Sequence, residues 1–218
     1  MKRSQSTLIA AIAGGAAIAI GFVWNAMAEQ GTDVPTESTR LSTAIFAGGC
    51  FWCVESDFDK VDGVVSTISG YTGGTVDNPS YKQVTYGDTG HYEAVKVSYD
   101  PQRVSYEELV DHFFHTIDPT DPRGQFCDKG PSYRTAVFVQ DAEERETAEA
   151  EIETIEESGV LPGPVVTKVI DASEFWPAED YHQDYYRTTP VRYRFYRQGC
   201  GRDAKLKKIW GDAAITAD

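Results

Sequence analysis

Apolar residues recur through the chain with two spacings, every second residue in some segments and every third to fourth residue in others. Alternation and β-branched runs predict strands, whereas the wider spacing predicts amphipathic helices. A capping box, Ser105–Glu108, marks the start of one such helix. In chain order the pattern predicts a strand over 41–47, a helix over 50–60, strands over 63–70 and 92–99, a helix from 105 to about 117, and a strand over 135–139.

This order, β-α-β-β-α-β, is typical of a two-layer ferredoxin-like core in the α+β class. Beyond it, the pattern predicts an acid-rich helix over 141–158, a strand over 165–170, a short helix near 178–186 and a basic helix near 202–210. We therefore expect the core to carry an added helix, an added strand and a C-terminal extension. A loop over 71–90 is long for a compact domain, which favours a functional role for it.

The N-terminus has the features of an export signal. Lys2 and Arg3 precede an uncharged apolar stretch over 8–24, and Ala26-Met27-Ala28 supplies the small residues of a cleavage site. We expect a signal peptide over 1–28 and an exported, periplasmic mature chain. The alternative is an uncleaved membrane anchor, because the stretch is near the lower limit of about 17 residues for a spanning helix.

The rest of the chain suits one domain of about 190 residues. We expect a polar linker over 29–40, a catalytic domain over 41–211 and a tail over 212–218. The formal net charge is −14, and without the leader 18 basic and 34 acidic residues leave −16. Such a surface argues against nucleic acid or anionic lipid as a partner. We expect no membrane contact once the leader is removed, and a monomer.

Two glycines join the first predicted strand to its helix and place Cys50 at the helix N-terminus. There the unpaired N–H groups and the helix dipole favour the thiolate, which is the nucleophilic form of cysteine. A zinc ribbon would need a second close pair, whereas Cys127 and Cys200 lie 73 residues apart. The spacing of Cys50 and Cys53 also suits a thioredoxin-type dithiol, which leaves that interpretation open.

Six segments with distinctive residues follow one another along the chain: Gly48–Trp52, Gly70–Gly74, Asn78–Tyr81, Gly87–Glu93, Tyr133–Arg134 and Ala178–Gln183. In this order, and at about this spacing, they resemble the peptide methionine sulfoxide reductase A family. The resemblance extends from about Leu41 to Trp210.

The resemblance implies a role for each polar residue of these segments. Cys50 would attack the sulfur of methionine sulfoxide, and Glu93 would protonate the departing oxygen, because burial favours its neutral, donating form. Tyr81 and Tyr133 would hydrogen-bond the sulfoxide oxygen, as an oxyanion hole does. Asp128 would hold water or a polar part of the substrate.

Aromatic residues would form the substrate-binding part of the site. Phe51 and Trp52 would enclose the methyl group, with Tyr185 as a further lining residue; without the motifs, packing would be the preferred role for Phe51 and Trp52. The fixed arrangement would accept one epimer of the sulfoxide, and the resemblance implies that the S epimer is the substrate, free or in proteins. Neither a cofactor nor a metal is expected, and the reaction would serve the repair of oxidised proteins.

Attack by Cys50 would leave a sulfenic acid, which a second cysteine converts to a disulfide. Thioredoxin, or an exported thioredoxin-like protein, would then reduce it. We favour Cys200 as the resolving residue, because glycines on both sides make its backbone flexible. Cys53, where the family commonly has glycine, is the alternative, and Cys127 would be a wall residue or a relay.

Two other classes of function remain at this stage. A dithiol oxidoreductase would use Cys50 and Cys53 and would not need Glu93. An inactive binding module would keep an aromatic pocket for methionine-containing peptides, although the full set of catalytic residues argues against it. A cysteine–histidine hydrolase with His91 or His182 is less favoured, and we assign His182 to packing or to support of the site.

Overall fold

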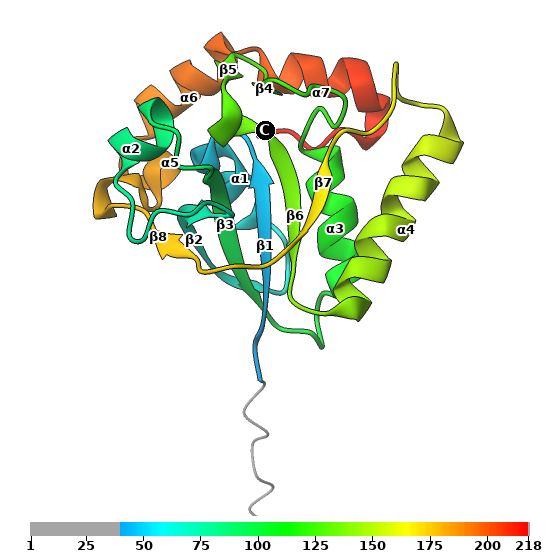
Figure 1. Ribbon diagram of the computed structural model, residues 1–218. Helices are drawn as coiled ribbons and strands as arrows, with labels where there is room; N and C mark the ends of the chain where they lie inside the picture. Colours follow the sequence, from blue (N-terminus) through cyan, green and yellow to red (C-terminus); the bar gives the residue numbers. More distant parts are fainter. Residues whose placement is uncertain (1–39, 218) are drawn as a thin grey trace, which may run out of the picture. The chain divides into compact units, whose positions relative to one another are not determined.

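The computed structural model describes residues 40–217, in which a six-stranded sheet is covered by helices (Figure 1). The strand order is β7-β6-β1-β3-β2-β8. The strands are β1 (Ser42–Gly48), β2 (Val64–Thr72), β3 (Tyr92–Tyr99), β6 (Thr135–Val139), β7 (Lys168–Asp171) and β8 (Trp176–Pro177). The helices are α1 (Phe51–Phe58), α2 (Tyr81–Tyr86), α3 (Tyr106–His115), α4 (Ala142–Ser158), α5 (Tyr185–Thr188), α6 (Pro190–Gly199) and α7 (Arg202–Trp210).

The predicted ferredoxin-like core is confirmed. Its elements follow the chain as β1, α1, β2, β3, α3 and β6, and β1 pairs antiparallel with both β3 and β6. The added helix and strand are α4 and β7, which runs parallel to β6, as expected for a strand reached through a helical crossover.

Alternation along β1 explains the layers. Ala44 and Phe46 belong to the large apolar cluster formed with the helices, while Ile45 and Ala47 belong to the cluster on the opposite face. All four side chains are buried. A strand buried on both faces has no solvent-facing polar positions, which is why its sequence is a nearly continuous apolar run.

Several elements differ from the sequence-based prediction. The loop over 71–90 contains α2, whose capping box joins Ser80 and Gln83. The helix predicted near 178–186 divides into a 3₁₀ turn over Asp180–His182 and α5. Helix α6 was not predicted, nor was the two-stranded hairpin of β4 (Gly124–Gln125) and β5 (Asp128–Lys129).

The predicted signal peptide over 1–28 and the linker over 29–40, apart from Arg40, lie outside the described residues. Within residues 40–217, no helix has the length and apolar character needed to cross a membrane.

Candidate active site

The junction of β1 and α1 places Cys50 at the carboxyl end of β1. Gly49 has φ +83°, and a Cβ atom there would lie 2.5 Å from Cβ of Gln125, so both the backbone angle and the space require glycine. Cys50 is the N-cap residue of α1, as the sequence predicts. Its side chain is only 6% exposed.

The sequence predicts a thiolate at Cys50, whereas its surroundings in the structure favour the protonated thiol. Burial raises the pKa of Cys50 well above its ordinary value, and the neighbouring Cys53, Glu93 and Asp128 raise it further. The pKa of Cys53 is lowered to about 7, mainly by a hydrogen bond from Cys50 and also by the charges of Arg202 and Arg197. Desolvation outweighs the helix terminus, and the proton of the pair resides on Cys50.

A small cavity opens beside Cys50 and has a volume of about 60 Å³. A cavity of this size has room for a small group such as a sulfinyl with its methyl group. The lining residues are Cys50, Phe51, Trp52, Tyr81, Glu93, Asp128, Tyr133 and Tyr196. Seven of the eight were nominated from the sequence, and Tyr196 was not.

Glu93 lies on β3 and is 1% exposed. Burial raises its pKa to about 8, although the backbone N–H of Phe51 donates a hydrogen bond to its Oε2 atom at 3.1 Å. Asp128 and Cys53 raise the pKa further, whereas Tyr133 lowers it through a hydrogen bond. At neutral pH the carboxyl group is therefore mostly protonated and can donate a proton into the cavity.

Tyr81 and Tyr133 face the cavity from two different segments. Tyr81 is the first residue of α2, and its backbone N–H donates to Oε1 of Glu179 at 2.9 Å. Tyr133 ends a 3₁₀ turn just before β6 and hydrogen-bonds both Tyr81 and Glu93. Burial raises the pKa of both phenols, so both remain neutral hydrogen-bond donors.

Asp128 and Tyr196 form the side of the cavity next to the C-terminal extension. The Tyr196 hydroxyl on α6 donates to Oδ2 of Asp128, and burial raises the pKa of Asp128. Tyr196 was not predicted from the sequence, because its helix is rich in arginine and tyrosine and has only a weak apolar pattern. Its four-residue spacing from the glycine-flanked Cys200 is the signal that points to it.

His182 supports the aromatic wall of the cavity, which consists of Phe51, Trp52 and Tyr81. The indole N–H of Trp52 donates to Nδ1 of His182 at 3.0 Å, and the His182 ring lies 4.9 Å from Phe51 and 4.5 Å from Tyr81, centroid to centroid. His182 thus supports the wall, as expected. Tyr185 stacks on Trp52 with 3.8 Å between ring centroids, outside the small cavity.

Ala178–Gln183 fastens the C-terminal segment to the sheet. Oε2 of Glu179 accepts from the Tyr71 hydroxyl at 2.8 Å, and Gln183 exchanges two hydrogen bonds with the backbone of Ser69. These contacts set the positions of Tyr81 and His182. The segment therefore contributes to the site through the hydrogen bonds of its Glu179 and Gln183 side chains.

Two buried arginines anchor the C-terminal extension near Cys53. Arg197 on α6 pairs with Asp57 of α1 at 2.8 Å and with Asp203 at 2.8 Å. Arg202 donates to the carbonyl oxygen of Thr116 at 2.8 Å. Both side chains are almost fully buried, and their charges are among the causes of the low pKa of Cys53.

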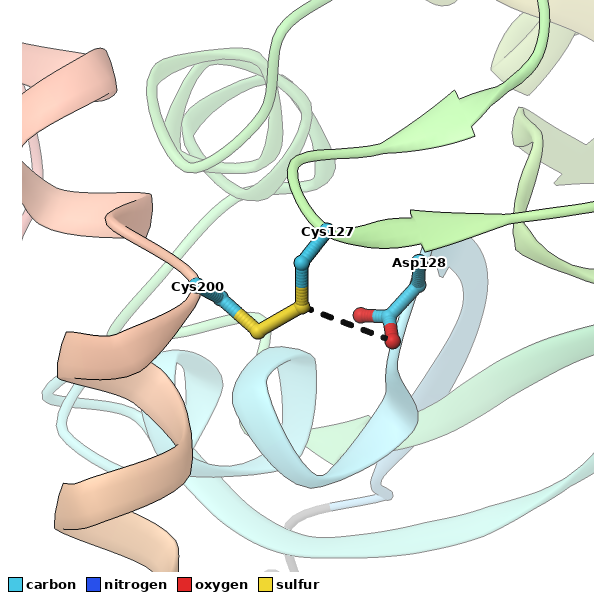
Figure 2. A group of neighbouring side chains, drawn as sticks. All are labelled: Cys127, Asp128 and Cys200. Carbon is cyan, nitrogen blue, oxygen red and sulfur yellow. Dashed lines mark hydrogen bonds between the residues drawn. A yellow bond between two sulfur atoms is a disulfide. The ribbon is translucent and has the colours of Figure 1, made fainter.

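The other two cysteines form a disulfide. Cys127, in the turn of the β4–β5 hairpin, is bonded to Cys200, which follows α6, with 5.0 Å between Cα atoms (Figure 2). The structure thus pairs Cys200 with Cys127, while Cys50 and Cys53 are free and buried. Cys127, Asp128 and Cys200 also bring three potential metal-ligand atoms within 4.8 Å, but a disulfide leaves no thiolate to bind a metal.

Known proteins are similar to this chain in sequence and in fold. A model of the family described as peptide methionine sulfoxide reductase matches residues 42–214. "Peptide methionine sulfoxide reductase MsrA 2" of Rhizobium meliloti (strain 1021) is 52% identical over 181 residues, which are 83% of this chain and 89% of that protein.

Two further relatives differ in the share of their length that this chain covers. "Peptide methionine sulfoxide reductase MsrA/MsrB" of Vibrio cholerae is 50% identical over 82% of this chain, but the chain spans only 47% of that protein. The solved structure of Mxr1 from Saccharomyces cerevisiae in reduced form is 32% identical with a TM-score of 0.64, and covers 71% of this chain and 88% of its own.

Proposed function

The chain belongs to the peptide methionine sulfoxide reductase A family, and we propose that it reduces methionine S-sulfoxide, free or in proteins, to methionine at the expense of thiols. The observation that carries this proposal is the small cavity. It brings a buried cysteine, a carboxyl group with a raised pKa and two neutral phenols together beside two aromatic rings. An enzyme that only exchanges thiols and disulfides would not need a proton donor such as Glu93.

Reduction of a sulfoxide requires a nucleophile for the sulfur, a proton for the departing oxygen and hydrogen bonds to that oxygen, and residues that line the cavity supply all three. Cys50 attacks the sulfoxide sulfur, while Glu93 protonates the oxygen and Tyr81 and Tyr133 hydrogen-bond it. Cys53, whose pKa is about 7, takes the proton from Cys50 as the new bond forms. The sulfoxide gains two electrons and leaves as methionine, and Cys50 is oxidised to a sulfenic acid.

The fixed walls of the cavity select one configuration at the sulfoxide sulfur. The oxygen must face Glu93 while the methyl group lies against Trp52, and only one configuration at sulfur meets both conditions. The test is turnover of a peptide carrying each epimer, with dithiothreitol as reductant. We expect turnover of the S epimer alone; equal rates on both epimers would contradict the assignment of the walls.

Resolution of the sulfenic acid is assigned to Cys200. Its thiol condenses with Cys50, which releases water, and Cys127 then attacks Cys200 to form the observed pair and free Cys50. The proximity of Asp128 to both the cavity and Cys127 supports this order. Cys53 is the second candidate, because a hydrogen bond already joins it to Cys50.

A Cys127→Ser variant distinguishes the two candidates, because the relay then stops one step earlier. After one equivalent of substrate and no reductant, peptide mapping should show Cys50 bonded to Cys200. A bond between Cys50 and Cys53 would instead assign resolution to Cys53. Wild-type protein treated in the same way should end with the Cys127–Cys200 bond.

The reductant that completes the cycle is assigned to the thioredoxin class, and the compartment to the periplasm. The basic start, apolar stretch and Ala26-Met27-Ala28 site of the leader support export. N-terminal sequencing of protein recovered from cells should give Glu29 as the first residue. A chain that retains its leader and sediments with membranes would favour the anchored alternative.

A further inference from the structure

A second, larger hollow of about 550 Å³ lies beside the disulfide, on the outer side of Trp52 and Tyr196. Cys127 and Cys200 form part of its lining, together with Val191 and Phe195 of α6. It shares only Trp52 and Tyr196 with the small cavity, and Cys50 does not line it. The reaction described above uses the sulfur atoms of this hollow and the ring of Trp52, but not the side chains of Val191 and Phe195.

The apolar part of the hollow is one face of α6. Val191, Phe195 and Gly199 follow one another at intervals of four residues, which places them in a row along α6, just before Cys200. Val191 is 79% exposed and Phe195 is 81% exposed, whereas Tyr193 and Arg197 on the opposite side are buried. Two large apolar side chains so exposed on one helix are typical of a contact surface.

The charge of this region is opposite to that of the chain. Residues 185–210 contain eight arginines and lysines and one acidic residue, whereas the whole chain has a net charge of −14. Arg192 lines the hollow, and Arg194 is exposed on the same helix. Within residues 40–217, neither of the two is assigned an ion pair.

Accessibility shows which sulfur an incoming protein can reach. Cys50 is 6% exposed and Cys53 is 2% exposed, so a folded reductant cannot reach either of them. Cys127 is exposed at the hairpin turn, and Cys200 is half-buried at the end of α6. Thiol–disulfide exchange requires the attacking thiolate to contact the disulfide, so a protein reductant must dock around Cys127.

We propose that Val191, Phe195, Arg192 and Arg194, here called the α6 face, form the docking surface for the protein dithiol that reduces the Cys127–Cys200 bond. This inference rests on the proposed function. The partner fits if its reactive cysteine lies in an apolar surface bordered by carboxylates, because that surface complements both the exposed apolar row and the arginines.

The exchange balances without a further reactant. A thiolate of the partner attacks Sγ of Cys127, which forms a mixed disulfide and releases Cys200 as a thiolate. The second thiol of the partner then attacks its own bonded sulfur and releases Cys127. The partner is oxidised by two electrons, and its two protons end on Cys127 and Cys200.

Thioredoxin, recycled by its reductase and NADPH, is the probe for the test, and dithiothreitol is the reference reductant. Phe195→Ser and the double variant Arg192→Glu/Arg194→Glu should each raise the KM for thioredoxin about tenfold, the change expected for loss of one anchor residue. With dithiothreitol, turnover and the KM for a methionine sulfoxide peptide should not change. Val65→Ser, at another exposed valine, is the matched control and should behave as wild type.

Three outcomes would overturn the docking surface. The first is an unchanged KM for thioredoxin in both variants. The second is a raised KM for the sulfoxide peptide with dithiothreitol, which would assign the α6 face to the substrate polypeptide. The third is a mixed disulfide on Cys200 rather than Cys127 when thioredoxin lacks its second active-site cysteine. Failure of the proposed function is distinct, since wild-type protein would then not turn over with dithiothreitol.

Discussion

The chain contains two cysteine pairs in opposite surroundings. Cys50 and Cys53 are buried at the start of α1, free, and enclosed by aromatic rings. Cys127 and Cys200 join a hairpin turn to the end of α6, and Cys127 is exposed. The contrast separates two kinds of chemistry, because sulfoxide reduction gains from a dry, fixed cavity, whereas exchange with a protein reductant requires contact.

Electrostatics sharpen the contrast. In the buried site, burial keeps the substrate-facing groups neutral: the pKa of Glu93 is about 8 and that of Cys50 is raised. Cys53, by contrast, has a lowered pKa, first because Cys50 donates a hydrogen bond to it and then because of the charges of Arg202 and Arg197. The α6 face instead keeps its arginines in solvent, where they can steer a charged partner. The same extension therefore supplies buried charges to one pair and exposed charges to the other.

Removal of the nucleophile should have the largest effect. Cys50→Ser should abolish release of methionine, because no other described cysteine lines the small cavity. Cys127→Ser and Cys200→Ser should each still release at least one methionine per enzyme in a single turnover of reduced protein without added reductant. Quantification of methionine after rapid mixing measures both results. Activity in Cys50→Ser would mean that the two pairs do not divide the work as described.

Loss of the proton donor should have the next largest effect. Glu93→Gln keeps the size of the side chain and its hydrogen bond from Phe51 but cannot supply a proton. The single-turnover rate should fall by roughly 10²–10⁴-fold, as for other positioned general acids. Peptide binding should change much less. A near-normal rate at neutral pH would transfer the donor role to Tyr133, Tyr81 or water.

The pH dependence should distinguish the buried pair from the exposed one. The attack needs the Cys50–Cys53 pair to lose a proton, which occurs above about pH 7, and needs Glu93 protonated, which holds below about pH 8. Single-turnover rates should therefore rise through pH 7 and fall above pH 8. Glu93→Gln should lose the alkaline limb. Cys127→Ser should keep the whole profile, and a profile altered in that variant would contradict the separation.

The core and most of the small cavity follow from the sequence because their signals are local. Alternation in β1 and β3 marks buried strands, and six of the eight lining residues lie within the recognisable motifs. Helix α6 was missed because its buried positions include Arg197, whose burial depends on Asp57, 140 residues away. The Cys127–Cys200 bond likewise joins segments 73 residues apart, and spacing alone does not reveal such a contact.

Tyr196 links the two regions, and its hydroxyl should have the smallest effect of these changes. Tyr196→Phe removes the hydrogen bond to Asp128 but keeps the ring, which lies 5.7 Å from Trp52. A hydrogen bond of about 0.5–1.5 kcal/mol corresponds to a loss of roughly two- to tenfold in kcat/KM for the sulfoxide peptide. The matched control is Tyr193→Phe on the same helix, which removes a hydroxyl that accepts from Arg197 at 3.1 Å. Tyr193 does not line the small cavity, so the control should leave kcat/KM with dithiothreitol close to that of wild type. An equal loss in both variants would mean that α6 acts on the buried site through its overall position and not through the contact between Tyr196 and Asp128.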